Sequence, residues 1–226
     1  VLKGVSMDVV EGQLTAIVGP GGSGKSTLLK LLLKLYAPSS GQIKAGELDL
    51  QTIPQRWWRE QCGAILQDSE VFSDTVVGNI TLSTNAPDEK RLREAITLAG
   101  IDAFVKRLPK GYDTKIGAGG IGLSAGEFQR ILLARMIYKN PSYVFLDEAT
   151  SALDPEQELE VWERLEGFLA GKTVVVIAHR LSTVMSADKL LVLQDGQVVQ
   201  YGDPQLLKAQ NGLFRTMLQH NKRMNW

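Results

Sequence analysis

The chain has 226 residues, 22% of them charged, and its 25 lysines and arginines balance 25 aspartates and glutamates. Zero formal net charge argues against a dedicated nucleic-acid surface, and the length allows one domain with a large core or an inserted lobe. The single cysteine, Cys62, excludes an intrachain disulfide framework and favours a reducing compartment. Apolar stretches fall short of the roughly 18 residues that span a bilayer. We expect a soluble chain, cut from something longer because it begins at Val1 within a strand-like pattern.

The first fifty-eight residues predict short strands around one helix. Residues 1–10 alternate loosely in polarity and meet a turn signal, which predicts a hairpin with a strand at 14–18. Residues 42–50 read as a short strand pair around a glycine. Trp57 and Trp58 are interpreted as packing residues, with a cation site beside the neighbouring arginines as the alternative.

A glycine loop with the sequence GPGGSGKST occupies residues 19–27, between the strand at 14–18 and an apolar helix at 26–36. It matches G-x-x-x-x-G-K-[ST] at every fixed position. Glycines let backbone N–H groups converge on phosphate oxygens, and the helix N-terminus adds its positive end. Lys25 then reaches the β and γ phosphates, and the Ser26 hydroxyl is placed for Mg²⁺. The alternative, a plain glycine turn, does not require the Lys-Ser pair.

Residues 68–140 read mainly as helix and loop and predict an inserted helical lobe. Within it, residues 88–100 form an amphipathic helix pattern with an aspartate cap and a terminal glycine. Further along, the sequence LSAGE at 123–127 opens a long helical pattern, and Ser124 with Glu127 fits the S-x-x-E capping box. Two interpretations stay open at this point: an ordinary well-capped helix, or a second anion-binding helix terminus.

An apolar strand at 143–146 ends in the adjacent carboxylates Asp147 and Glu148. This arrangement suits Mg²⁺ ligation by the first and water activation by the second, with plain surface charges as the alternative. A helix is predicted at 154–169 and a buried parallel strand at 173–177.

His179 follows the strand at 173–177 at its carboxyl end, where open α/β sheets bind ligands. It is a candidate γ-phosphate sensor, and a purely structural histidine is the alternative. After it, Asp195-Gly196 signals a two-residue hairpin, and the tail from residue 203 reads as helical and amphipathic.

The ordered set of motifs resembles the nucleotide-binding domain of the ATP-binding cassette (ABC) transporter family over essentially the whole chain. In that family's terms, four segments look like the Walker A loop, signature, Walker B strand and D-loop: residues 19–27, 123–127, 143–147 and 151–154. Three single residues are similar to the Q-loop glutamine, catalytic glutamate and switch histidine: Gln67, Glu148 and His179.

The resemblance implies an α/β fold, a P-loop NTPase core of the RecA-like type. The core with an antiparallel β subdomain would comprise residues 1–67 and 141–226, and an inserted α-helical subdomain residues 68–140. The implied catalytic residues are Glu148, His179 and Lys25. The implied nucleotide-binding residues are Gly19, Pro20, Gly21, Gly22, Ser23, Gly24, Lys25, Ser26, Thr27, Gln67, Ser124 and Gly126. The implied Mg²⁺ ligands are Ser26, Gln67 and Asp147.

The resemblance also implies an activity, ATP hydrolysis that drives export through an attached transmembrane domain. ATP would lie between the Walker A loop of one cassette and the signature of a second, so a head-to-tail homodimer is expected. The phrases DEATSALD, IAHRLST and DGQVVQYG look like those of exporters, including bacterial peptide or protein exporters. Residues 67–80 would then receive the membrane domain, at the cytoplasmic face of the membrane, and no nucleic acid is expected.

Two other functions stay as alternatives. A mechanical or DNA-associated ATPase of the same superfamily would need a coiled-coil or zinc insertion, and neither heptads nor clustered cysteines occur. A regulatory cassette that binds ATP without hydrolysing it is disfavoured by Glu148 and His179.

Three departures from the family pattern matter. The signature reads LSAGE where the family usually has LSGGQ, so Ala125 adds a methyl group and Glu127 a negative charge close to the expected phosphates. If Glu127 turns back into the capping box its carboxylate lies off the phosphates; otherwise it weakens nucleotide-driven dimerisation. Ala118 stands where exporters often carry Glu. The aromatic residue that stacks on adenine is expected upstream of Val1.

Overall fold

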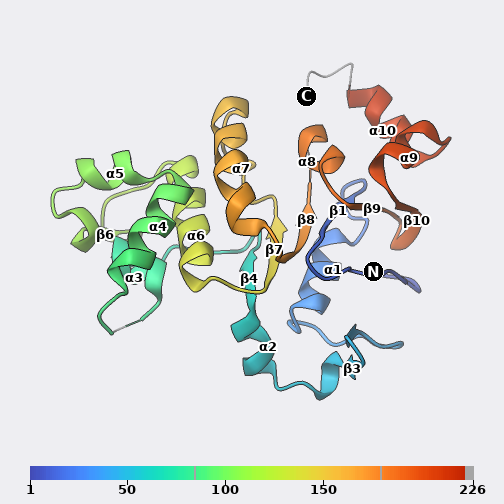
Figure 1. Ribbon diagram of the computed structural model, residues 1–226, viewed down its shortest axis with the longest axis horizontal. Helices are drawn as coiled ribbons and strands as arrows, with labels where there is room; N and C mark the ends of the chain where they lie inside the picture. The colour runs from blue at the N-terminus through green and yellow to red at the C-terminus, as the bar shows by residue number, and fades with distance from the viewer. Residues whose placement is uncertain (84, 179, 222–226) are drawn as a thin grey trace. The chain divides into compact units, whose positions relative to one another are not determined.

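The computed structural model describes residues 1–83, 85–178 and 180–221. The chain forms two compact units, and most of their elements are labelled in Figure 1. Unit 1 comprises Val1–Cys62, Ser142–Glu148 and Gly171–Trp226, and unit 2 comprises Gly63–Pro141 and Ala149–Ala170. This grouping places residues 149–170 with the helices of unit 2, whereas the sequence predicts a core at 1–67 with 141–226. The subdomain division itself stays a prediction.

A mainly parallel sheet forms the centre of unit 1. Five of its strands lie side by side in the order β10 (Gln197–Gly202), β9 (Lys189–Gln194), β1 (Leu14–Val18), β8 (Thr173–Ile177) and β7 (Tyr143–Asp147). The pairs β9·β1, β1·β8 and β8·β7 are parallel, and β10 is antiparallel to β9. All five residues of β8 are buried, as expected for a parallel strand covered on both faces.

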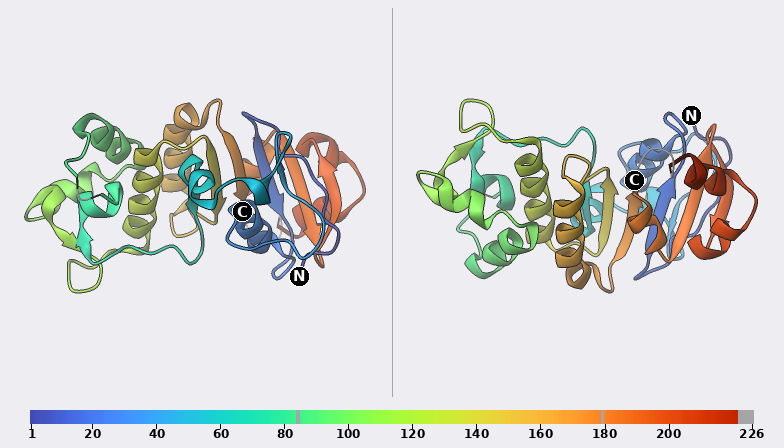
Figure 2. Two further views of the ribbon diagram at one scale, coloured as in Figure 1. Left: turned by 90° about the horizontal axis from the view of Figure 1, so that it is seen from below. Right: turned by 90° about the horizontal axis from the view of Figure 1, so that it is seen from above.

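Helices cover both faces of this sheet. In the view from below in Figure 2, α1 (Lys25–Leu32) lies in front of the sheet, and in the view from above α8 (Leu181–Met185) and α10 (Leu213–Asn221) lie in front of it. The short helix α9 (Pro204–Ala209) contacts β10 and α10. The helical tail predicted from residue 203 onward is therefore confirmed as far as residue 221.

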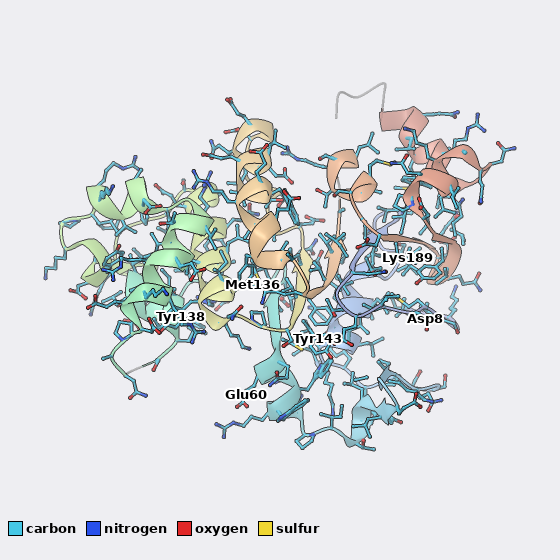
Figure 3. The ribbon with its side chains drawn as sticks, viewed as in Figure 1. Asp8, Glu60, Met136, Tyr138, Tyr143 and Lys189 are labelled. Atoms are coloured by element: carbon cyan, nitrogen blue, oxygen red, sulfur yellow. The ribbon has the colours of Figure 1, made fainter. Side chains whose placement is uncertain are left out.

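The hairpin predicted between residues 1–10 and the first strand is wrong. Residues 1–10 contain no strand, because β1 is already paired with β8 on one side and β9 on the other and offers no free edge. The segment is held instead by single bonds: the Lys3 N–H donates to the Gly196 carbonyl over 2.8 Å, and the Tyr201 hydroxyl to the carbonyl of Asp8, labelled in Figure 3, over 2.6 Å.

The predicted strand pair around Gly46 is confirmed by β2 (Lys44–Ala45) and β3 (Leu48–Asp49), which are antiparallel. Helix α2 (Gln55–Gln61) and strand β4 (Cys62–Ile65) follow. The packing interpretation holds for Trp58, whose indole donates to the Leu32 carbonyl. Its ring lies 4.9 Å, centroid to centroid, from the ring of Tyr143, which is labelled in Figure 3. The interpretation fails for Trp57, which is 52% exposed.

Unit 2 is built mainly from helices: α3 (Val76–Thr81), α4 (Glu89–Ala99), α5 (Asp102–Arg107), α6 (Ala125–Lys139) and α7 (Pro155–Leu169). The short strands β5 (Asp74–Thr75) and β6 (Lys115–Ile116) pair antiparallel. Helix α6 packs against α3 and α4, and α4 also packs against α7. As predicted, α4 is capped by Asp88, ends at Gly100 and buries one apolar face, and α7 runs from an Asp154 cap to Leu169.

None of the helices in the described part of the chain combines the length and hydrophobicity that crossing a bilayer requires.

Candidate functional site

The glycine loop joins β1 to α1, as the sequence predicts. Gly19 is required by close approach, because a Cβ there would lie 2.1 Å from the carbonyl oxygen of Leu193 in β9. Gly24, immediately before α1, has φ 103°, which residues with a Cβ rarely adopt. At these two positions the path from strand to helix is open only to glycine.

The first turn of α1 presents its backbone N–H groups without a side-chain cap from Gly24 and without an acidic residue in that turn. Such groups lack intrahelical partners and carry the positive end of the helix dipole. A Cβ on Gly21 or Gly22 would meet no described atom within 4 Å, so the outer side of the loop is open. An open loop leading into an uncapped helix N-terminus is suited to an anion of phosphate type.

Ser23 adds a second indication that the loop is built for a ligand. The residue is 3% exposed, and within the described chain its Oγ has no hydrogen-bond partner. Leaving a buried hydroxyl unpaired costs about 1–3 kcal/mol. A phosphate oxygen in the loop would supply the partner that the described residues do not.

Lys25 lies over the loop that precedes it. Its Nζ donates to the carbonyl oxygens of Gly19 and Pro20 over 2.8 and 2.9 Å. Burial lowers the pKa of this ammonium, and the nearby negative charges of Asp147 and Glu148 oppose that shift. The cation of the loop and the two predicted carboxylates therefore lie within electrostatic reach of one another in unit 1.

The sheet register explains why these carboxylates meet the loop. Ile177 in β8 is paired with Ile17 of β1 on one side and with Asp147 of β7 on the other. Asp147, 3% exposed, therefore lies level with the end of β1, where the loop begins. Glu148 comes next with φ 55°, a left-handed backbone that costs a non-glycine residue roughly 1–2 kcal/mol. Such strain often accompanies functional positions.

These residues fit a magnesium nucleotide. The loop and helix N-terminus offer backbone donors and a cation for phosphates, and the Ser26 hydroxyl in α1 and the Asp147 carboxylate are the hard oxygen donors that Mg²⁺ prefers. The fit rests on the open glycine loop, the unpaired Ser23 hydroxyl and this donor set.

The remaining predicted site residues lie outside the described part of unit 1. His179 lies outside the described residues. Gln67, Ser124 and Gly126 belong to unit 2, each in its own local setting. Gln67 is exposed in a turn directly after β4, which the Ser69 hydroxyl closes by accepting from the Leu66 N–H over 2.8 Å.

The signature segment forms the predicted capping box at the start of α6. The Glu127 N–H donates to Ser124 Oγ over 3.2 Å, and the Ser124 N–H donates back to Glu127 Oε2 over 2.9 Å. The Glu127 carboxylate thus turns back onto Ser124, which is the first of the two arrangements that the sequence left open. Its other oxygen, Oε1, lies 3.2 Å from Nη2 of Arg107 at the end of α5.

Sequence reasoning missed Gln129, which ties the signature helix to residues 151–154. Its amide nitrogen donates to Ser151 Oγ over 3.1 Å, and its amide oxygen accepts from the Ala152 N–H over 3.0 Å. A Cβ on Gly126 would lie 3.2 Å from Leu153, so the same helix turn packs closely on this loop. A glutamine two residues after LSAGE carries no pattern that could have revealed a partner 22 residues away.

Arg135 and Asn79 were also missed, and they order the segment at 67–80. The Asn79 amide, fully buried, donates to the Phe72 carbonyl over 2.9 Å and accepts from the Phe72 N–H over 2.7 Å. The Arg135 guanidinium in α6 donates to the carbonyls of Asn79 and Glu70 and lies 5.2 Å from the centre of the Phe72 ring. Phe72 is nevertheless 50% exposed, so an aromatic ring is presented at the surface on a fixed backbone.

A family model and several relatives match most of this chain. The sequence model of the family described as ABC transporter matches residues 2–151, more than half of the chain. ABC transporter B family member 13 of Arabidopsis thaliana is 40% identical over 96% of this chain, which corresponds to 18% of that protein. The leukotoxin translocation ATP-binding protein LktB of Mannheimia haemolytica is 41% identical over 95% of this chain and 30% of its own length.

Among solved structures, a bacterial Atm1-family ABC exporter with ATP bound superimposes with a TM-score of 0.91 at 38% identity, covering 97% of this chain and 38% of that one. The predicted α/β P-loop fold is therefore confirmed. The chain spans less than a third of the length of the curated relatives described above.

Proposed function

Because the chain belongs to the ABC transporter family and is an ATPase domain of the exporter type, we propose that it is the motor of a membrane exporter. In this proposal ATP binding joins two cassettes head to tail, and hydrolysis separates them again. The movement drives a substrate through an attached transmembrane domain.

The residues of unit 1 would do the chemistry. The amides of the loop at 19–27 and the Lys25 ammonium hold the phosphates and offset the charge that develops on the transferring phosphoryl group. Glu148, next to the buried end of β7, orients or deprotonates the attacking water. His179 is assigned the same γ-phosphate region. Mg²⁺, held by Ser26, Asp147 and Gln67, would supply further charge neutralisation at the phosphate oxygens.

A second copy of the chain would complete each site. The chain carries one glycine loop and one signature, so Ser124 and Gly126 of α6 would contact the phosphates bound by the partner's loop. A symmetric head-to-tail homodimer has two such composite sites.

The membrane domain would dock on residues 67–80, at the cytoplasmic face of the membrane. The half-exposed Phe72 ring, held in place by Asn79 and Arg135, supports this assignment, since rigid exposed aromatic residues often anchor protein interfaces. The names of the relatives give no single cargo, because they include a leukotoxin translocation protein and plant B family transporters.

The two alternatives from the sequence receive less support. A mechanical or DNA-associated ATPase would need a coiled-coil or zinc insertion, and the described helices of unit 2 reach only 15 residues while the sequence has one cysteine. A purely regulatory cassette is disfavoured because Glu148 keeps its position directly after the buried strand end.

The observation that carries the proposal is the meeting, in unit 1, of an open glycine loop with the Lys25 cation and the carboxylates at the end of β7. Two variants test it. Glu148→Gln should abolish turnover while ATP-bound dimers accumulate, and full hydrolysis by this variant would remove Glu148 from its role. Lys25→Ala should lose nucleotide binding, and an unchanged affinity would refute the cradle.

A further inference from the structure

Glu127 occupies both hydrogen-bond donors of the signature serine. Glu127 Oε2 accepts from the Ser124 N–H over 2.9 Å and from the Ser124 hydroxyl over 2.8 Å. Both groups belong to the N-cap residue of α6, at the helix end where the proposed function places the partner's phosphate. In the single chain, one carboxylate oxygen therefore stands in for a phosphate oxygen at this position.

The second oxygen of the same carboxylate binds a cation from another helix. Glu127 Oε1 accepts from Arg107 Nη2 over 3.2 Å, and the two residues are separated by 20 positions in the sequence. The Arg107 side chain is 70% exposed and that of Glu127 is 24% exposed. Arg107 can therefore follow the carboxylate, and Glu127 is the more buried member of the pair.

A carboxylate and a phosphate cannot both occupy the donors of Ser124 without repulsion. Two like charges at this separation repel even in bulk water, and more strongly where the site excludes water. Binding of the partner's nucleotide therefore requires the carboxylate to leave Ser124, and its other side-chain partner in the structure is Arg107.

We propose that Glu127 is an internal anion that competes with ATP for Ser124, and that Arg107 is the positioning residue that receives its carboxylate when the composite site closes. The inference rests on the proposed function, because it assigns the phosphate to the partner chain's ATP. It makes Glu127, where the family usually has glutamine, the residue that sets how much ATP is needed to join two cassettes.

Three variants separate this mechanism from a merely structural ion pair. Glu127→Gln keeps a side chain of the same length for the capping box but removes its charge, so ATP should join the chains more readily. Arg107→Ala leaves the carboxylate on Ser124 uncompensated, so association should weaken. In the double variant R107A/E127Q, residue 127 carries no negative charge for Arg107 to bind. The loss of Arg107 should then have no effect on ATP-driven association.

The test is made in the Glu148→Gln background, so that ATP-bound dimers accumulate, and follows dimerisation by sedimentation as ATP is titrated. We expect R107A to raise the ATP concentration for half-maximal dimerisation about tenfold, equivalent to about 1.4 kcal/mol, and E127Q to lower it. The double variant should match E127Q. The R107A effect should shrink at high salt.

Lys106→Ala is the matched control, because it removes the same charge from the same last turn of α5 and leaves the Arg107–Glu127 pair in place. ATP binding to the single chain is measured in parallel with dilute protein, where only the glycine loop contributes. The ATP affinity of the single chain should be equal in all variants. Equal affinity would also show that each variant is folded.

The inference would be overturned if R107A raised the ATP concentration for half-maximal dimerisation equally with and without E127Q. It would also be overturned if E127Q raised that concentration as much as Ser124→Ala does. In either case ATP-driven dimers would still exist, and the proposed function would stand. Failure of every variant, including the Glu148→Gln parent, to dimerise with ATP would overturn the proposed function, and the inference with it.

Discussion

Replacing Gln129 by leucine should loosen residues 151–154 from the signature helix without disturbing the glycine loop. Leucine keeps the approximate volume but removes the donor to Ser151 Oγ and the acceptor of the Ala152 N–H, bonds of 3.1 and 3.0 Å. Ser151 and Ala152 are exposed, so water replaces part of what is lost. The substitution should therefore change the position of residues 151–154 more than the stability of the core.

The expected size follows from these two bonds. A neutral hydrogen bond contributes about 0.5–1.5 kcal/mol, and water access places both bonds toward the lower end. Losing the single bond at the Ala152 amide should then speed its hydrogen exchange by about two- to fivefold, since about 1.4 kcal/mol is a factor of ten. If the loop position matters for the composite site, the ATPase rate should fall while ATP affinity of the single chain is unchanged.

Amide hydrogen exchange at Ala152, followed by NMR, measures this directly. Gln129→Glu is the matched control, because its carboxylate can still accept from the Ala152 N–H and the Ser151 hydroxyl can rotate to donate to it. Equal acceleration of exchange by leucine and glutamate, or no change with either, would refute the role of Gln129 in holding residues 151–154. A double-mutant cycle with Ser151→Ala should show coupling, and strict additivity would mean that the two side chains act separately.

Three further predictions concern the loop and the docking segment. Gly19→Ala forces a Cβ to within 2.1 Å of the Leu193 carbonyl, so the loop must shift; we expect a lower melting temperature and lost ATP binding, and wild-type binding by calorimetry would contradict this. Burial lowers the pKa of Lys25 from 10.5, against the opposing charges of Asp147 and Glu148, so ATP affinity should decline with rising pH below 10.5. In that pH window the unfolded chain binds the Lys25 proton more tightly than the folded chain, so the stability of the ligand-free protein should rise with pH. Lys25→Arg should abolish the loss of ATP affinity at alkaline pH. A pH titration of affinity identical to wild type would count against Lys25 as the phosphate-binding cation. Phe72→Ala removes a ring that is 50% exposed, so melting temperature and ATPase of the single chain should hardly change, while transport by the assembled exporter should fall; normal transport would remove residue 72 from the docking surface.

Local patterns sufficed for the parts of the fold that local chemistry decides. The glycine loop, the Asp88 cap, the Ser124 capping box and the Asp195-Gly196 turn each depend on residues within a few positions, and each is confirmed. The hairpin predicted at residues 1–10 failed for a non-local reason, since the neighbours of β1 come from residues more than 150 positions away.

The side chains that support the candidate site were not visible in the sequence for the same reason. Gln129, Arg135 and Arg107 find their partners 22, 56 and 20 positions away, and an isolated glutamine or arginine carries no signature of such a contact. The departure at Glu127 was visible, but its consequence depended on whether the carboxylate turned toward Ser124. The role assigned to His179 stays a prediction, because that residue lies outside the described part of the chain.

The composite site is tested most directly by mixing two inactive variants. Lys25→Ala disables the glycine loop and Ser124→Ala the signature, so a mixed head-to-tail dimer contains one site with both defects and one intact site. At equal concentrations about half of the dimers are mixed, so ATP hydrolysis should return to about a quarter of the wild-type rate if the sites turn over independently. A mixture no more active than its separate components would contradict the claim that each site is shared between two chains.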